Sequence, residues 1–216
     1  MNKNNSFYYR LGIVIGLSLL CVLVYSVFSY YKVKKGNTGT LDDYYQNVAL
    51  AFKNDQFDRS KEQLNKAIES MKSIETGMDS FSRSQIDRSI DELELLQHSI
   101  DKDLVSGDFL DVVLSRSLHT LALGEIRRAK SEILRNNLAK GLVSLDNARA
   151  HLITSRAYTG VFKQHRDDGL INQIEGLSVA LKANENYIDK LDLLSSRSMD
   201  LSIGLHTRAP TTSSEP

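Results

Sequence analysis

The sequence predicts an all-α protein in which a single N-terminal transmembrane helix precedes an antiparallel bundle of about five to six amphipathic helices. Three observations predict this fold class. An uncharged apolar run occupies residues 11–28. Both prolines lie at the C-terminal end of the chain, so no proline interrupts the helices before them. Beyond residue 40, apolar residues recur at intervals of three and four, the spacing of one helix face.

The first element is the apolar segment 11–31, which we expect to cross a membrane. It supplies the roughly 20 apolar residues that span a hydrocarbon core about 30 Å thick. Tyr8–Tyr9 and Tyr30–Tyr31 flank it, as aromatic belts flank membrane helices at both interfaces. A cleaved signal peptide is the alternative, but that class has a shorter apolar region and a small-residue cleavage site, which Val27-Phe28-Ser29 matches poorly.

Gly12 and Gly16 form a GxxxG pattern within this segment. Small residues four apart let two membrane helices approach closely. We therefore name both glycines as candidate interaction residues, toward another membrane protein or a second copy of this chain. The simpler explanation is that glycine is common in membrane helices.

The orientation of the span is set only weakly by charge. Lys3 and Arg10 on the amino side nearly balance the lysines at 32–35 on the other side. No cysteine follows Cys21, which suits an oxidising compartment for the rest of the chain. We expect a bacterial inner-membrane protein with its amino terminus inside and its C-terminal domain on the periplasmic side.

The composition beyond the span is that of a mildly acidic domain. The chain has 27 basic and 27 acidic residues, but residues 1–35 hold five of the basic ones and no acid. The remainder therefore has 22 basic residues against 27 acidic ones, a net charge of −5. Because nucleic-acid binding needs a basic surface, we expect no nucleic acid as a partner.

The expected organisation is a flank at 1–10, the transmembrane helix at 11–31, a linker at 32–40, the helical bundle at 41–205 and a disordered tail at 206–216. Three helical segments in the bundle share one apolar template, and they start at Phe57, Ile86 and Leu138. The residues that we expect to begin or end helices are Thr40, Asn54–Asp55, Gly77, the capping box Ser84–Asp87, Gly107 with Asp108 as the next N-cap, Asn136–Asn137 and Tyr158–Gly160.

The last helix is expected to begin near Asp167 and to carry a heptad seam typical of a coiled coil. Leucines and isoleucines alternate steps of four and three from Leu170 to Leu191. Asn184 falls on this seam, where it would fix the register of packing or face solvent at a helix edge.

The sequence indicates no catalytic residue, cofactor or metal. No two of the five histidines have the spacing of metal ligands, and the domain has no cysteine to act as a nucleophile. The run His165–Asn172 fits the letters of a kinase catalytic loop, but the glycine-rich loop and a downstream Asp-Phe-Gly are missing. We interpret Asp167 and Asp168 as acids at the N-terminus of the last helix.

Two groups of residues in the domain are candidate interaction surfaces. Tyr44, Tyr45 and Phe52 follow the linker, where aromatic side chains would contact lipid headgroups or a neighbouring membrane subunit. Arg127 and Arg128 belong to a basic stretch in an acidic domain, which would grip an acidic partner. The simpler interpretations are the bundle core for the aromatic group and a solvated helix face for the arginines.

The sequence thus predicts a non-catalytic, membrane-anchored helical protein that acts as a scaffold, an accessory subunit or an assembly factor of a membrane complex. This hypothesis rests on the architecture and on the lack of an active-site motif. The alternative is an extracytoplasmic sensor whose helical bundle binds a small molecule in a polar or aromatic cavity.

Overall fold

The computed structural model describes residues 37–100, 104–159 and 161–206, and this part of the chain is all-helical, as predicted. From Thr38 onward the chain forms one compact unit. Its seven α-helices and one 3₁₀ turn are α2 (Asn37–Lys53), α3 (Phe57–Glu75), α4 (Ser80–Ile100), α5 (Gly107–Leu134), α6 (Leu138–Ser155), η1 (Arg156–Tyr158), α7 (Val161–Ala183) and α8 (Ile188–His206).

The predicted span 11–31, with Gly12 and Gly16, lies outside the described residues, as do the flank 1–10 and residues 207–216 of the predicted tail. Among the helices that are described, none is both long enough and apolar enough to cross a bilayer.

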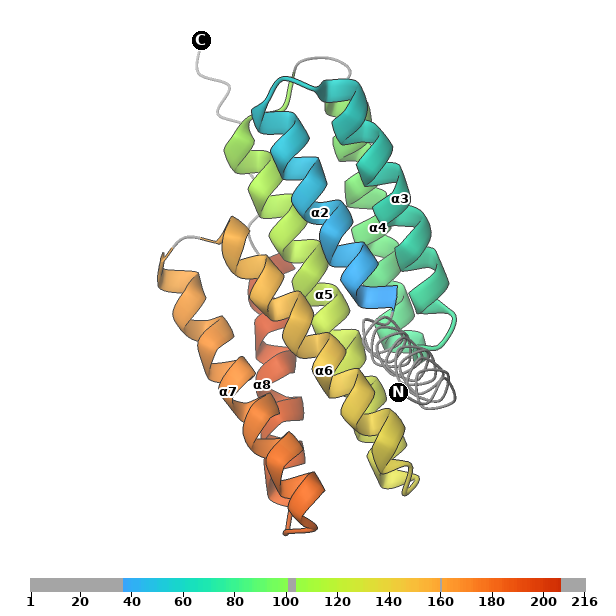
Figure 1. The fold of residues 1–216 in the computed structure, drawn as a ribbon, viewed down its shortest axis with the longest axis vertical. Coiled ribbons are helices and arrows are strands. Elements are labelled where there is room, and N and C mark those ends of the chain that lie inside the picture. Colours follow the sequence, from blue (N-terminus) through green and yellow to red (C-terminus); the bar gives the residue numbers. More distant parts are fainter. Residues whose placement is uncertain (1–36, 101–103, 160, 207–216) are drawn as a thin grey trace, which may run out of the picture. The chain divides into compact units, whose positions relative to one another are not determined.

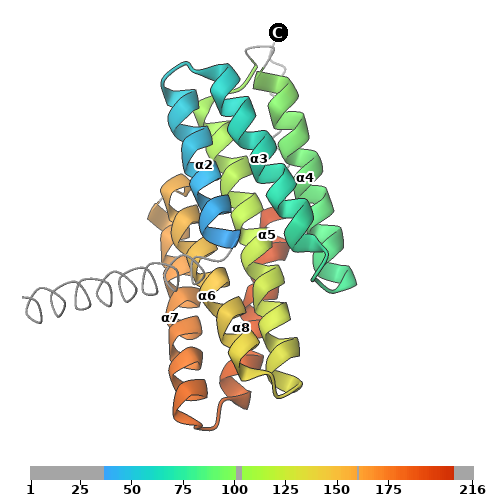
Figure 2. The ribbon, with the colours of Figure 1, turned by 45° about the vertical axis from the view of Figure 1, so that its right-hand side comes forward.

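The seven helices form two four-helix groups that share α5. Figure 1 shows α2, α3 and α4 beside one half of α5, and α6, α7 and α8 beside the other half. The same arrangement is visible after a turn of 45° in Figure 2. Helices that follow one another in the chain run in opposite directions, as short connections require. The single bundle predicted from the sequence is therefore two bundles in series.

Two hydrophobic cores correspond to the two groups. The first is built from buried residues between Leu41 and Leu121, and the second from buried residues between Ala122 and Leu194. Helix α5 serves both cores because its 28 residues span about 40 Å at 1.5 Å per residue. Every side chain from Ser117 to Ile126 is buried, so this stretch of α5 has no solvated face.

Two of the predicted helix breaks are confirmed. Asp55 follows the end of α2, and Asn136 follows the end of α5. Both adopt left-handed backbone angles, with φ of 55° and 61°. Asn and Asp tolerate this conformation better than other residues that have a side chain. The sequence therefore marks these two turns with residues suited to them.

The predicted last helix is wrong, because it is two helices. Asn184, with φ of 56°, ends α7, and α8 begins at Ile188. The seam from Leu170 to Leu191 thus passes through a turn and is not a continuous coiled coil. Asn184 terminates a helix and fixes no register, since the left-handed conformation directs the chain away from the helix axis.

Several predicted helix starts are also wrong. The N-cap of α4 is Asp79 and not the predicted box at Ser84. Oδ1 of Asp79 accepts hydrogen bonds from the backbone N–H groups of Phe81 and Ser82, at 3.0 and 3.1 Å. Ser106 caps α5 in place of Asp108, through a 3.2 Å bond from the Phe109 N–H.

Three further boundaries differ from the prediction. Residues 37–40 of the expected linker belong to α2, so Thr40 lies within this helix and not before its start. Gly107 begins α5 and does not end α4. Helix α7 begins at Val161, and Asp167 therefore lies beyond its first turn.

Candidate functional site

A layer of buried polar side chains lies where the two helix groups meet. We call it the junction layer; its members are Asp42, Ser115, His119, His151, Ser155 and Asp167. These residues come from α2, α5, α6 and α7. Buried polar groups need hydrogen-bond partners, and most partners here lie on a different helix. The layer therefore joins α5 to α7, α6 to α7 and α6 to α2 through side-chain hydrogen bonds.

His119 is at the centre of the junction layer. Leu118 of the first core and Ala122 of the second flank it on α5. Its Nδ1 lies 2.7 Å from the backbone carbonyl oxygen of Ser115 and 3.3 Å from the Ser115 hydroxyl. Its Nε2 lies 2.7 Å from Oδ1 of Asp167. The ring thus joins α5 to α7.

Asp167 is buried, with a side chain only 1% exposed, and is not the solvated helix-terminal acid that the sequence suggested. Its second oxygen, Oδ2, accepts a 3.1 Å hydrogen bond from the hydroxyl of Ser155 on α6. Asp168, its neighbour, is half-exposed and pairs with Arg156 at 3.0 Å. The two acids therefore have different environments, which their adjacency in the sequence does not reveal.

A second histidine–aspartate pair crosses between the helix groups. Nδ1 of His151 on α6 lies 2.8 Å from Oδ1 of Asp42 on α2. His151 is fully buried, and its Nε2 has no hydrogen-bond partner. The Asp42 carboxylate accepts the hydrogen bond from Nδ1, so Nε2 is the buried ring atom that the described residues leave without a partner.

The predicted aromatic group lies in or against the first core, the simpler of its two interpretations. Tyr45 is fully buried; its hydroxyl bonds the Ser117 hydroxyl and lies 3.1 Å from the Met71 sulfur. Burial raises the pKa of Tyr45 far above its ordinary value. Tyr44 and Phe52 are partly buried against the same core, and the Phe52 ring meets that of Phe57 edge-on at 5.5 Å.

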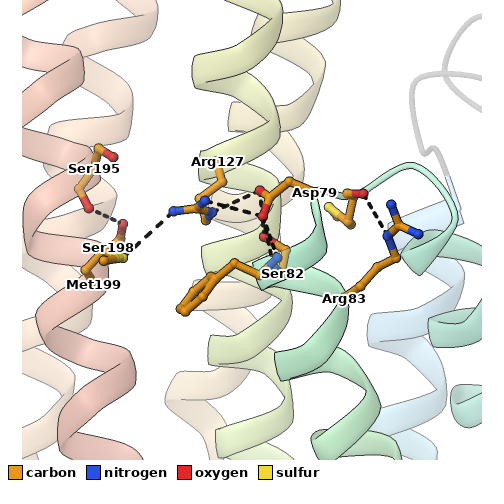
Figure 3. A network of polar contacts seen from close by, with 9 residues as sticks. Asp79, Ser82, Arg83, Arg127, Ser195, Ser198 and Met199 are labelled. Atoms are coloured by element: carbon orange, nitrogen blue, oxygen red, sulfur yellow. Dashed lines mark hydrogen bonds and ion pairs between the residues drawn. The ribbon is translucent and has the colours of Figure 1, made fainter.

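The predicted basic group makes contacts within the chain. Arg127 donates to both carboxylate oxygens of Asp79, at 2.9 and 3.3 Å. Its guanidinium also lies 4.8 Å from the centre of the Phe81 ring and contacts the Met199 sulfur at 3.9 Å. Figure 3 shows Arg127 between the start of α4 and helix α8, so this side chain also joins the two helix groups.

Arg128 has partners of its own. It pairs with the buried carboxylate of Glu125 at 3.8 Å and packs its guanidinium over Gly77. Neither arginine therefore presents an unpaired charge, although both remain partly exposed.

The side chains of the junction layer hold helices together, and their arrangement is not that of a catalytic or metal site. Ser155, His119 and Asp167 are the residue types of a catalytic triad, but Ser155 bonds the carboxylate and not the imidazole. The serine beside the imidazole is Ser115, whose hydroxyl lies 3.3 Å from Nδ1, and that nitrogen lies closer, at 2.7 Å, to the Ser115 carbonyl oxygen. A nucleophilic serine must give its proton to the imidazole. Among the described residues, no three potential ligands gather as a metal site requires.

Sequence reasoning missed both histidine–aspartate pairs. One signal was available for Asp167: the apolar positions Leu170, Ile171 and Ile174 place residue 167 on the same face of the helix. Another was His119, which stands in a stretch of α5 that is apolar on most sides. Comparison with known proteins gives no match: no family model, no curated protein and no solved structure is significantly similar to this chain.

Proposed function

We propose that this chain is a non-catalytic, membrane-anchored helical interaction protein, an accessory subunit or assembly factor of a membrane complex. A single span at 11–31 anchors it, and the helices from Thr38 onward form its periplasmic domain. Its partner is a membrane protein or a second copy of the chain.

The observation that carries this proposal is the uncharged segment 11–28, which ends shortly before a folded helical unit. An uncharged run of this length favours the bilayer, because a helix there satisfies its own backbone groups. The anchor and the domain are close in sequence, so a partner bound to either one is held at the membrane.

The polar contacts of the junction layer favour a structural role for these residues over a catalytic one. The carboxylates of the junction layer are hydrogen-bonded to histidine or serine of the same layer. A catalytic site needs at least one such group to reach a substrate, and the side chains of this layer are buried within the helical unit. The sensor alternative likewise requires polar groups that face a ligand, and these groups face one another.

The proposal is tested with the full chain in native membranes. We expect it to stay in the pellet after alkaline carbonate washing and to purify in mild detergent with a stoichiometric companion or as a defined oligomer. The variant Gly12→Ile/Gly16→Ile should lose that association, because bulky side chains keep two helices apart.

The matched control is Val14→Ile/Ser18→Ile, which adds the same side chains at the same spacing on the opposite face of the helix. The control should keep the association. Release of the chain by carbonate would overturn the anchor. Recovery of monomer alone would overturn the interaction role.

A further inference from the structure

Met199 on α8 presents a thioether sulfur near the surface. The chain has four methionines, of which Met1 lies outside the described residues. Met71 and Met78 are buried, with exposed fractions of 0% and 4%, whereas Met199 is 38% exposed. An oxidant dissolved in water therefore reaches the sulfur of Met199 far more readily than the two buried sulfurs.

The sulfur of Met199 also has a cation beside it. Nη1 of Arg127 lies 3.9 Å from this sulfur, and Figure 3 shows the contact. Asp79 holds the guanidinium through hydrogen bonds of 2.9 and 3.3 Å, and the central carbon of the guanidinium lies 4.8 Å from the centre of the Phe81 ring. Residues at the start of α4 thus position Arg127 to donate toward α8. Because a thioether sulfur is a weak acceptor, the contact adds little to the attachment of α8.

We propose that Met199 is a site of reversible oxidation by peroxides, and that its sulfoxide fastens α8 to α5 through Arg127. In this step a lone pair of the sulfur attacks one oxygen of hydrogen peroxide. The O–O bond breaks as the S–O bond forms, and the proton of the transferred oxygen leaves with the departing hydroxide as water. The sulfur loses two electrons and the peroxide gains them. A methionine sulfoxide reductase, with a thiol as the reductant, returns the thioether.

The product offers Arg127 a stronger acceptor. A sulfoxide oxygen carries a partial negative charge, and a charged donor forms a stronger hydrogen bond to such an oxygen than to a thioether sulfur. Rotation about the Cγ–Sδ bond turns this oxygen toward the guanidinium, which the partial exposure of the side chain allows. Oxidation of a core methionine such as Met71 would instead place a polar oxygen among apolar side chains.

The new bond would lie beyond other contacts that attach α8. Leu191 and Leu194 are buried in the second core, and Asp192 pairs with Lys130 of α5 at 2.8 Å. All three residues of α8 precede Met199. A charge-assisted bond at Met199 therefore adds an attachment nearer to the C-terminal end of α8 and should slow local opening there. This inference concerns the folded domain and depends on neither the anchor nor a partner.

The test uses the full chain in peroxide-free detergent micelles, briefly exposed to dilute hydrogen peroxide. Mass spectrometry of peptides then measures the oxygen gained at each methionine. We expect Met199 to be oxidised at least about tenfold faster than Met71 or Met78. Hydrogen exchange of the α8 amides near Met199, with those of α3 as the internal reference, should slow about threefold or more after oxidation. Treatment with a methionine sulfoxide reductase should reverse this change.

Three variants separate the new bond from other effects of the oxidant. Met199→Leu keeps a similar apolar volume but cannot be oxidised, so peroxide should leave hydrogen exchange in α8 unchanged. Met199→Gln carries an amide oxygen in place of the sulfoxide oxygen, so its α8 amides should exchange more slowly than those of Met199→Leu before peroxide is added. Arg127→Leu leaves Met199 open to oxidation but removes the donor, so oxidation should no longer slow exchange.

The proposal is overturned if Met71 or Met78 is oxidised as fast as Met199 in the folded chain. It is also overturned if oxidation speeds hydrogen exchange in α8 or leaves it unchanged, or if Arg127→Leu shows the same slowing as the wild type.

Discussion

Asp79 shows at the scale of one residue how a single carboxylate serves two purposes. It caps α4 through two backbone N–H groups and pairs with Arg127 of α5. Its burial alone would raise its pKa, but the hydrogen bonds from Arg127 and Ser82 outweigh that effect and hold the pKa below the ordinary value of 3.8. The folded protein therefore favours the ionised form of this group.

A lowered pKa gives the Asp79 contribution a definite pH dependence. The stabilisation is present above the pKa of the unfolded chain and is lost as the pH falls through the lower folded value. Asp79→Asn keeps a capping side chain but lacks the charge. We expect it to be less stable by up to about 1 kcal/mol at neutral pH, since the pair is partly exposed. Urea unfolding curves should converge with those of the wild type in acid.

Asp111 is a control for Asp79, because its pKa is shifted in the opposite direction. Burial raises its pKa, Lys53 opposes this effect, and Asp108 adds to it. The ionised form is thus unfavourable in the folded state. Asp111→Asn should be slightly more stable than the wild type at neutral pH, and this difference should also vanish in acid. A loss of stability in Asp111→Asn would contradict the assignment.

At the scale of an element, Gly141 sets how closely α6 approaches α5. A Cβ on this residue would lie 2.6 Å from Cγ1 of Ile133 and 3.4 Å from the Ala129 carbonyl oxygen. Ile133 is buried and β-branched, so it cannot move aside freely. Glycine is therefore required here by contact and not by backbone conformation.

Gly141→Ala should lower the free energy of unfolding by about 1 kcal/mol. Overpacking costs about 1–3 kcal/mol, and alanine's better helix propensity offsets about 1 kcal/mol of it. Gly176 on α7 is the matched control, because a Cβ there meets nothing within 4 Å. Gly176→Ala should raise stability by roughly 0.5–1 kcal/mol. Thermal or urea unfolding measures the stability change of each variant. The close approach of α6 to α5 would be refuted if Gly141→Ala and Gly176→Ala changed stability equally.

Helices and turns could be predicted from the sequence where neighbouring residues in the chain determine them. Apolar spacing predicts the helices, and Asn136 predicts its turn because the residue itself favours the left-handed conformation. Asn184 has the same preference, yet the heptad spacing around it suggested a continuous helix. The cap of α4 was missed although it is local: Asp79 is a residue type that caps helices, and its capping bonds go to Phe81 and Ser82, but the Ser84–Asp87 pattern was preferred.

The junction layer could not be predicted because its bonds link distant parts of the chain. His119 and Asp167 are 48 residues apart, and His151 and Asp42 are 109 apart. Each pairing depends on which helices become neighbours and on their rotation about their axes. The spacing of apolar residues gives the rotation approximately, but it does not give the order of helices around a core.

At the scale of the whole described unit, α5 couples the two cores. It packs against α4 and α6 and also contacts α8, and its central stretch is buried on every side. A break in α5 would expose both cores together. We therefore expect the two helix groups to unfold in one transition, although each has a core of its own.

Leu93→Ala in the first core and Leu177→Ala in the second test this coupling. Both leucines are fully buried, and each change should lower stability by about 2–5 kcal/mol. In each variant the whole domain should unfold in a single transition at lower stability, and circular dichroism and hydrogen exchange should both report that transition. Leu95→Ala is the control, because this side chain is 69% exposed. Its replacement should change the free energy of unfolding by less than about 0.5 kcal/mol. Two separate transitions would contradict the coupling.

The division of the cores at residues 121 and 122 also bears on how the protein is made. Every residue of the first core leaves the ribosome before any residue of the second. A nascent chain can close the first four-helix group early, while the far end of α5 still displays apolar residues such as Ile126 and Ile133. Those residues are then covered only when α6, α7 and α8 emerge. During synthesis the second half of α5 therefore keeps apolar side chains exposed until the second group of helices forms.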